Sequence, residues 1–263
     1  MRRCDLVLLH GQPGLGSDWA QLLDRLPAQV REHAIAMDRP GHGANPAPGG
    51  DLDVSADAVI AELDAAGVER AVLVGHSYGG GVALRVAARF PDRVSALILL
   101  ASVGPDCLNG WDRLLAAPLA GPVCSLFAWR LTPWAARAVL RWLGRKDGPD
   151  EAARRHANLY VWGHTRWDHG PLWRTFLAEQ RALLRGAGEL AAVAPRITAP
   201  VLLLADPGDP MVPLRTAQAL AALLPDARLR LISGAGHHLP LRAPDKVASE
   251  MVAFLAEVGS PAT

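Results

Sequence analysis

The sequence predicts an α/β fold in which a mostly parallel sheet of about six strands is flanked by helices. Three observations predict this class: the length, the composition and the order of apolar segments. The chain has 263 residues, of which 50% are hydrophobic and 20% are charged, as in an ordinary globular domain. Apolar runs of strand length alternate with segments of helical period, which is typical of a parallel sheet covered on both faces.

The strands are expected at five short apolar runs, namely residues 6–9, 34–37, 71–74, 94–100 and 201–204, and at residues 228–232. Helices are expected where apolar residues recur every three or four positions. These segments are residues 20–26, 54–66, 82–90, 214–224 and 244–258. Because strands and helices alternate up to residue 100 and again from residue 201, both stretches are assigned to one core.

The segment between these stretches interrupts the alternation. It holds seven of the eight tryptophans, several prolines and helical patterns at residues 135–143 and 173–184. We therefore predict a core of residues 1–101 and 196–263 and a helical cap, or lid, of residues 102–195. The aromatic crowding fits either the cap's own small core or a wall that faces a ligand. On the second interpretation the candidate substrate-binding residues are Trp129, Trp134, Trp162, Trp167 and His238.

Charge and cysteine content argue against several classes of protein. A formal net charge of +1 provides no broad field for a polyanion, so we expect a small-molecule substrate and no nucleic acid. The three cysteines lie far apart without a CxxC pair, which indicates neither a disulfide framework nor a zinc site and fits a reducing cytoplasm. We expect no metal and no other cofactor, and the oligomeric state is left open.

No targeting segment or membrane span is expected. The first residues are charged and lead directly into the first strand, without the pattern of a signal peptide. The most membrane-like stretch, residues 114–129, is short and contains Pro118, Gly121 and Pro122. We therefore predict a cytoplasmic protein that does not insert stably into a membrane.

The strongest chemical signal is the motif Gly75-His76-Ser77-Tyr78-Gly79-Gly80, which lies between a predicted strand and a predicted helix. A sharp strand-to-helix turn exposes the serine in a strained backbone conformation, and glycine two residues before and after it avoids a collision. The helix N-terminus favours negative charge that develops next to Ser77. We therefore predict that Ser77 is a nucleophile.

Two turns follow earlier strands at the same edge of the sheet. The first is His10-Gly11-Gln12-Pro13-Gly14, and the backbone N–H groups of Gln12 and Tyr78 are candidates for an oxyanion hole. The second is Asp38-Arg39-Pro40-Gly41-His42-Gly43, to which we assign a structural role. His42 is a candidate base that we rank below His237.

A serine nucleophile needs a base, and the base needs a carboxylate that fixes its tautomer. Asp209 follows the fifth predicted strand and His237 follows the sixth, so the chain order is Ser, Asp, His, as this architecture requires. We predict that these three residues form a catalytic triad. The alternatives are Asp206 and Asp106 for the acid and His238 for the base.

Together these segments resemble the α/β-hydrolase superfamily, in particular its cap-bearing esterases, lactonases, carbon–carbon bond hydrolases and perhydrolase-like members. The resemblance covers nearly the whole chain and rests on residues 10–14, 38–43 and 75–80 with Asp209 and Gly236-His237. It implies the α/β-hydrolase fold, a helical cap, Asp209 as the acid, His237 as the base, and the Gln12 and Tyr78 backbones as oxyanion donors. Family members with Asp as the nucleophile include dehalogenases and epoxide hydrolases, so Ser77 argues against both activities.

The sequence departs from the family at its start. Two antiparallel strands normally precede the His-Gly turn in the family, but only nine residues precede His10 here. We therefore expect about six strands, with the first two family strands missing, unless the natural chain starts upstream of Met1. The absence of these strands affects how the edge of the sheet is protected, and it bears on the oligomeric state.

The predicted reaction is hydrolysis of an ester, a lactone or a related carbonyl compound through an acyl-enzyme. A second hypothesis uses the same site for cofactor-free carbon–carbon cleavage, oxygenation or cyclisation of a bulky metabolite. A third hypothesis is a ligand-binding receptor without turnover. Arg137, Arg141 and Arg145 recur at helical spacing and indicate an anionic substrate only if they face the site, since such a row is more often solvated.

Overall fold

The computed structural model describes residues 5–164 and 172–259. Within these residues, six parallel strands form one sheet in the order β2-β1-β3-β4-β5-β6. The strands are β1 (Leu6–Leu9), β2 (Ala34–Met37), β3 (Ala71–His76), β4 (Val94–Leu100), β5 (Val201–Ala205) and β6 (Ala227–Leu231). The predicted class, an α/β fold with a sheet of about six mostly parallel strands, is therefore confirmed. All carboxyl ends of the strands point to one edge of the sheet, where the loops that carry the candidate site lie.

Alternation of side chains along each strand divides the core into two layers. In β1, Val7 and Leu9 belong to one buried cluster, whereas Leu6 and Leu8 belong to the other. This alternation follows from the period of two along a strand, which sends successive side chains to opposite faces. The inner strands are almost continuously apolar because both of their faces are covered by helices. The edge strand β6 instead carries Arg228 and Arg230 and is only partly buried.

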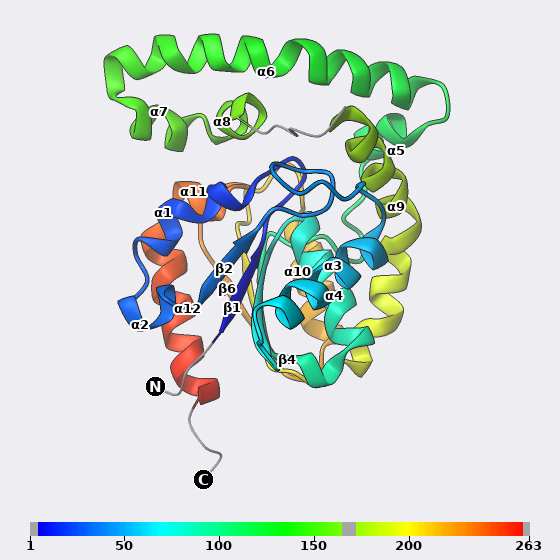
Figure 1. Cartoon of the computed structure of the whole chain (residues 1–263), viewed down its shortest axis with the longest axis vertical. Coiled ribbons are helices and arrows are strands. Elements are labelled where there is room, and N and C mark those ends of the chain that lie inside the picture. The colour runs from blue at the N-terminus through cyan, green and yellow to red at the C-terminus, as the bar shows by residue number, and fades with distance from the viewer. Residues whose placement is uncertain (1–4, 165–171, 260–263) are drawn as a thin grey trace.

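Helices cover the two faces of the sheet, as Figure 1 shows. One face carries α3 (Leu52–Ala65), α4 (Tyr78–Arg89) and α10 (Leu214–Leu223). The other face carries α1 (Ala20–Leu23), α11 (Leu239–Arg242) and α12 (Pro244–Gly259). The predicted helix 20–26 is short here, because α1 ends before Pro27, which lies at the N-cap of α2 (Ala28–Arg31).

The segment between β4 and β5 folds into five helices in the described residues. They are α5 (Gly110–Ala116), α6 (Ala120–Asp147), α7 (Pro149–Arg155), α8 (Ala157–His164) and α9 (Leu172–Val193). Figure 1 shows α6 as the outermost layer, with α7 and α8 between it and the carboxyl edge of the sheet. The helix α9 also belongs to the core, because Leu183, Ala187 and Leu190 lie in the same buried cluster as α4.

In the part of the chain that the structure describes, no single helix is long and apolar enough to cross a membrane. One bent pair, Gly110–Ala116 with Ala120–Arg145, meets the length and hydropathy criteria together, and its two helices meet at 96°. The bend lies at the Pro118-containing break that the sequence indicates.

Candidate active site

Ser77 lies on a sharp turn between β3 and α4. Its backbone has φ 53° and ψ −119°, a combination that costs on the order of 1–3 kcal/mol and persists only where the surroundings impose it. The turn is held on both sides, because the Ser77 N–H donates to the Leu100 carbonyl (3.0 Å) and the Ser77 carbonyl accepts from the Val103 N–H (3.1 Å). Both partners lie in or directly after β4, so the neighbouring strand fixes the position of Ser77.

Glycine is required on both sides of this serine. A Cβ at position 75 would lie 2.5 Å from the Gly79 carbonyl oxygen, and a Cβ at position 79 would lie 2.1 Å from the Leu9 carbonyl oxygen. Both distances are below any normal van der Waals contact. The Gly-x-Ser-x-Gly spacing therefore lets α4 pack against the end of β1, which carries the next component of the site.

The structure brings Ser77, His237 and Asp209 into one hydrogen-bonded chain. The Ser77 hydroxyl is 3.0 Å from Nε2 of His237, and Nδ1 of His237 is 2.8 Å from Oδ2 of Asp209. The side chains of His237 and Asp209 are almost fully buried. In the tautomer that this geometry favours, Nδ1–H donates to the carboxylate and Nε2 accepts from the serine, which is the arrangement of a nucleophile with its base.

Two of the three candidate acids, Asp209 and Asp206, have different hydrogen-bond partners. Oδ1 of Asp209 accepts from the N–H groups of Met211 (2.7 Å) and Val212 (3.0 Å), so its other oxygen remains for His237. Asp206 instead accepts from the N–H groups of Gly208 (2.7 Å) and Gly236 (2.6 Å). Burial would raise the pKa of Asp206, but these backbone donors outweigh it and lower that pKa. Asp206 therefore joins the two loops that carry the acid and the base.

The turn after β1 lies against the serine. A Cβ at Gly11 would be 3.1 Å from the Cβ of Ser77, and the next residue, Gln12, lines the same cavity as Ser77. Tyr78 is the first residue of α4, where backbone N–H groups have no helical partner. Gln12 therefore lines the cavity beside Ser77, and Tyr78 lies in the first turn of α4 directly after Ser77.

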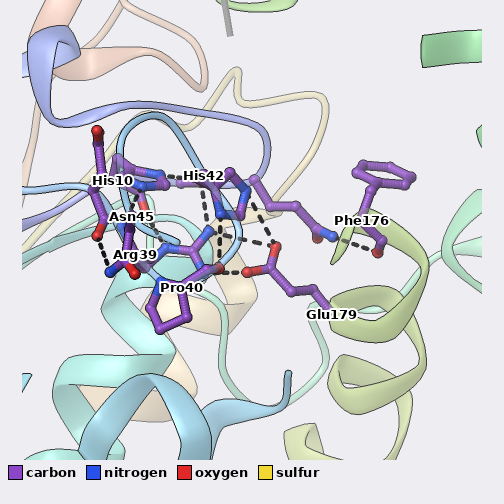
Figure 2. Close-up of polar contacts among 10 residues, drawn as sticks. His10, Arg39, Pro40, His42, Asn45, Phe176 and Glu179 are labelled. Atoms are coloured by element: carbon purple, nitrogen blue, oxygen red, sulfur yellow. Dashed lines mark hydrogen bonds and ion pairs between the residues drawn. The ribbon is translucent and has the colours of Figure 1, made fainter. Parts of the chain in front are cut away.

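A buried polar cluster holds the turn after β1 (Figure 2). Nε of Arg39 donates to the His10 carbonyl (3.0 Å), and Nη2 donates to the Gly11 carbonyl (2.9 Å). The same guanidinium forms an ion pair with Glu179 of α9, and both side chains are fully buried. The side-chain amide of Gln12 donates from Nε2 to the Phe176 carbonyl at 2.8 Å. The helix α9 therefore contacts this turn directly through Phe176 and indirectly through Glu179 and Arg39.

Sequence reasoning assigned no role to His76, the residue before the serine. Its Nε2 lies 2.8 Å from the His237 carbonyl oxygen. Burial, and then the neighbouring His237, lower the pKa of His76 to about 3, so the ring is neutral and its Nε2–H donates to that carbonyl. Its place inside the Gly-x-Ser-x-Gly motif was the only signal in the sequence for this contact.

The alternative histidines lie away from the serine hydroxyl. Nε2 of His238 is 2.5 Å from Oδ1 of Asn158 on α8. His42 lies beside Glu179 and the Pro40 carbonyl. Burial lowers the pKa of both rings, with His237 as the next cause for His238 and Arg39 as the next cause for His42. The alternative acid Asp106 is exposed on the loop after β4.

A cavity of about 290 Å³ contains Ser77 and His237. Its remaining lining is mostly apolar and includes Pro13, Val103, Leu115, Trp162, Phe176, Leu183, Met211 and Val212. Trp162 stacks on Trp129 with ring centroids 4.9 Å apart, and both rings pack against Phe176. Trp129 therefore packs within the small core of the cap, behind Trp162, whereas Trp162 lines the cavity.

Other residues predicted to bind substrate lie elsewhere. Trp134 is 70% exposed on α6, and His238 lines two neighbouring pockets but not the one that contains Ser77. Trp167 lies outside the described residues. Arg137, Arg141 and Arg145 are exposed on α6, so the condition for the predicted anionic substrate is not met and we withdraw that prediction.

Residues 5–164 and 172–259 contain no group of three or more His, Cys, Asp or Glu side chains arranged to hold a metal ion. Cys107 lines the cavity with Ser77, and burial raises the pKa of its thiol. A raised pKa keeps the sulfur in its weakly nucleophilic thiol form, which argues against Cys107 as a nucleophile in this cavity.

Comparison with known proteins gives consistent matches. Residues 6–244 match the sequence model of a family described as "alpha/beta hydrolase fold". A pimeloyl-[acyl-carrier protein] methyl ester esterase from Aromatoleum aromaticum is 33% identical, over 94% of this chain and 96% of that protein. A 2-hydroxymuconate semialdehyde hydrolase from Pseudomonas sp. (strain CF600) is 27% identical, over 98% of this chain and 88% of that protein. The structure of Est816, described as an N-acyl homoserine lactone degrading enzyme, has a TM-score of 0.69 at 26% identity, over 95% of this chain and 93% of that one.

Proposed function

The chain belongs to the α/β-hydrolase family, and we propose that it is a serine hydrolase that cleaves a carboxylic ester or lactone through an acyl-enzyme. The observation that carries this proposal is the chain of hydrogen bonds from Ser77 through His237 to Asp209, at 3.0 Å and 2.8 Å. This arrangement removes the hydroxyl proton as the serine oxygen attacks a carbonyl, which makes a weak nucleophile effective.

The proposed reaction has two halves. In the first, His237 accepts the Ser77 proton, the serine oxygen attacks the carbonyl carbon, and the same proton passes to the departing alcohol. In the second, His237 accepts a proton from water as the water oxygen attacks the acyl carbon. The bond from that carbon to the Ser77 oxygen then breaks, His237 returns the proton to the Ser77 oxygen, and the acid leaves. Asp209 stabilises the imidazolium in both halves, and the N–H groups of Gln12 and Tyr78 bind the oxyanion, each worth roughly 3 kcal/mol of transition-state stabilisation.

The lining of the cavity supports an uncharged substrate with an apolar acyl group. Trp162, Phe176 and Leu183 belong to the apolar part of the lining, and apolar walls bind hydrocarbon portions of ligands. Asn109, Asp112 and Gln180 also line the cavity, and the carboxylate of Asp112 disfavours an anionic substrate. One relative is named as a methyl ester esterase, and the solved structure of Est816 is described as that of an N-acyl homoserine lactone degrading enzyme. We therefore propose methyl esters of medium-chain acids and N-acyl homoserine lactones as the first compounds to test.

A trapping experiment tests the proposal directly. A fluorophosphonate should label Ser77, and rapid quenching during turnover of a slow ester should give an acyl adduct on a peptide that contains Ser77. Replacing Ser77 with Ala should abolish both adducts and reduce kcat by about 10⁴-fold to 10⁶-fold. The matched control is Ser17→Ala, since Ser17 is exposed at the start of the 3₁₀ helix Gly16–Trp19. Near-full turnover of Ser77→Ala would refute the assignment.

The same experiment separates the competing hypotheses. The relative named 2-hydroxymuconate semialdehyde hydrolase supports testing carbon–carbon bond cleavage on vinylogous 1,5-diketones. Turnover of such a diketone without any acyl-Ser77 would favour His237 as a general base in cofactor-free chemistry. Binding without turnover across esters, lactones and diketones would favour the receptor hypothesis.

A further inference from the structure

The outer side of α6 has an apolar half and a cationic half. Figure 1 shows α6 as the outermost layer of the molecule along its whole length. In its first half, and just before it, large apolar side chains face solvent at intervals of about four residues: Leu119, Val123, Phe127, Leu131 and Trp134. Phe127 and Leu131 are each 61% exposed and Trp134 is 70% exposed. Contiguous apolar exposure of this kind is unusual on a monomeric protein and indicates a binding surface.

The second half of the same side carries arginines at the same spacing. Arg137, Arg141 and Arg145 are exposed, and at 100° per residue they project over the same arc as the apolar residues that precede them. Arg130 is also exposed, between Phe127 and Leu131. The outer side of α6, which we call the outer face, is therefore one continuous strip about 39 Å long that passes from apolar to cationic.

The strip itself contains no negative charge. Residues 113–146 include six cations and neither Asp nor Glu. The opposite side of α6 packs inward, as the burial of Ser125 and Ala136 shows. A helix with one exposed apolar and cationic side and one packed side is complementary to a surface that is negatively charged at its boundary and apolar beneath it.

We propose that the outer face of α6 binds the surface of an anionic phospholipid bilayer, with α6 lying in the plane of the interface. Trp134, Phe127 and Leu131 would enter the boundary between headgroups and acyl chains, and the arginines would contact the phosphate groups. The adjoining helix α5 adds Trp111, which is 72% exposed and also lines the cavity that contains Ser77. This inference concerns binding and does not depend on the proposed reaction.

Two other occupants fit the outer face less well. A second copy in parallel alignment would place Arg137, Arg141 and Arg145 opposite one another, and an antiparallel copy would place them on the partner's apolar half. A membrane span is disfavoured because α5 and α6 meet at 96° and because arginines recur through the second half of α6, where each is costly at the bilayer centre.

Vesicle flotation of the full chain tests the proposal. The protein should float with vesicles in which one third of the lipid is phosphatidylglycerol, and binding to pure phosphatidylcholine vesicles should be at least roughly a hundredfold weaker, because each interfacial arginine contributes about fivefold. High salt should weaken the binding. Alkaline carbonate should release the protein, as expected for a protein that lies on the bilayer.

Two sets of variants assign the binding to the two halves. The triple variant Arg137→Gln, Arg141→Gln, Arg145→Gln should lose roughly a hundredfold in binding to anionic vesicles, and Phe127→Gln with Trp134→Gln should also lose most of it. A matched triple on the core, Arg196→Gln, Arg215→Gln, Arg230→Gln, removes three exposed charges and should bind as the wild type does. Hydrolysis of a water-soluble ester, or circular dichroism if no ester is turned over, reports that each variant is folded.

Several results would overturn the proposal. Equal binding by the α6 triple and the core triple would show that only net charge matters. Resistance to carbonate extraction would indicate a span. Absence of binding to anionic vesicles would exclude the lipid surface, and a dimer that dissociates in the Phe127→Gln, Trp134→Gln variant would assign the outer face to a second copy.

Discussion

The guanidinium of Arg39 and the carboxylate of Glu179 form a fully buried ion pair between the loop after β2 and α9. Arg39 also donates to the His10 and Gly11 carbonyls, so it links a helix of the segment between β4 and β5 to the turn that carries Gln12. Burial raises the pKa of Glu179 and Arg39 partly offsets this effect. The position of the proposed oxyanion turn therefore depends on Glu179, which lies 140 positions after Arg39 in the sequence.

Replacing Glu179 with Gln should destabilise the protein strongly. The variant leaves the buried Arg39 without its counter-charge, and breaking such a pair costs about 3–5 kcal/mol. The measurement is the free energy of unfolding in urea. The control is Glu151→Gln, which removes the exposed partner of Arg154 and Arg155 and should leave the unfolding midpoint nearly unchanged. Equal effects of the two variants would show that the buried pair has no special role.

Asp209, rather than another candidate acid, should fix the tautomer of His237. Replacing Asp209 with Asn favours the wrong imidazole tautomer and should lower kcat by about 10⁴-fold with a small change in KM. The exposed Asp106 follows the neighbouring strand, so Asp106→Asn serves as the control and should retain activity. Steady-state kinetics on one ester distinguish the two, and loss of activity in Asp106→Asn alone would reverse the assignment.

His76 should make the fold sensitive to acid. Its pKa is about 3 in the folded protein, against 6.5 for an ordinary histidine, so the unfolded chain binds more protons between these values. The contribution of neutral His76 to the free energy of unfolding is fully present above pH 6.5. It is lost as the pH falls toward 3, by up to about 1.4 kcal/mol per pH unit. Replacing His76 with Gln should keep a donor to the His237 carbonyl and remove this proton uptake.

The measurement for His76→Gln is the free energy of unfolding at several pH values between 4 and 7. The free energy of unfolding should fall less steeply with decreasing pH in the variant than in the wild type. The difference should correspond to the uptake of as much as one proton fewer on unfolding. Burial also lowers the pKa of His10, His42 and His238, so a residual slope is expected. An identical slope in both proteins would mean that His76 is not buried in its neutral form.

Trp162 should set the length of the acyl group. Because this ring lines the cavity, Trp162→Ala should enlarge it and raise the ratio of kcat/KM for long over short esters by about tenfold, as methylene contacts of 1–3 kcal/mol permit. Trp134 is exposed outside the cavity, and Trp134→Ala should leave the ratio for water-soluble esters unchanged. If the ratio changed in both variants or in neither, the placement of Trp162 on the cavity wall would be contradicted.

Much of the fold was accessible from sequence patterns. All six strands lie within about two residues of their predicted positions. Five of them were predicted from apolar runs, because buried strands require continuous apolar side chains, whereas β6 carries Arg228 and Arg230 and is partly exposed. The prediction for β3 stopped at Val74, whereas the strand continues to His76, because Gly75 and His76 lack the apolar signal that the prediction used. The helix 135–143 proved to be part of α6, whose amphipathic pattern is split into apolar and cationic halves.

Sequence alone determined which residues are able to form the candidate site, since Ser77, Asp209 and His237 each follow a parallel strand and such strand ends meet at one edge. Only the tertiary structure decided between neighbours in the chain. Asp206 and Asp209 differ in which backbone N–H groups surround each carboxylate, and Trp162 and Trp134 differ in which side of a helix packs inward. Such choices depend on long-range packing, which local patterns do not encode.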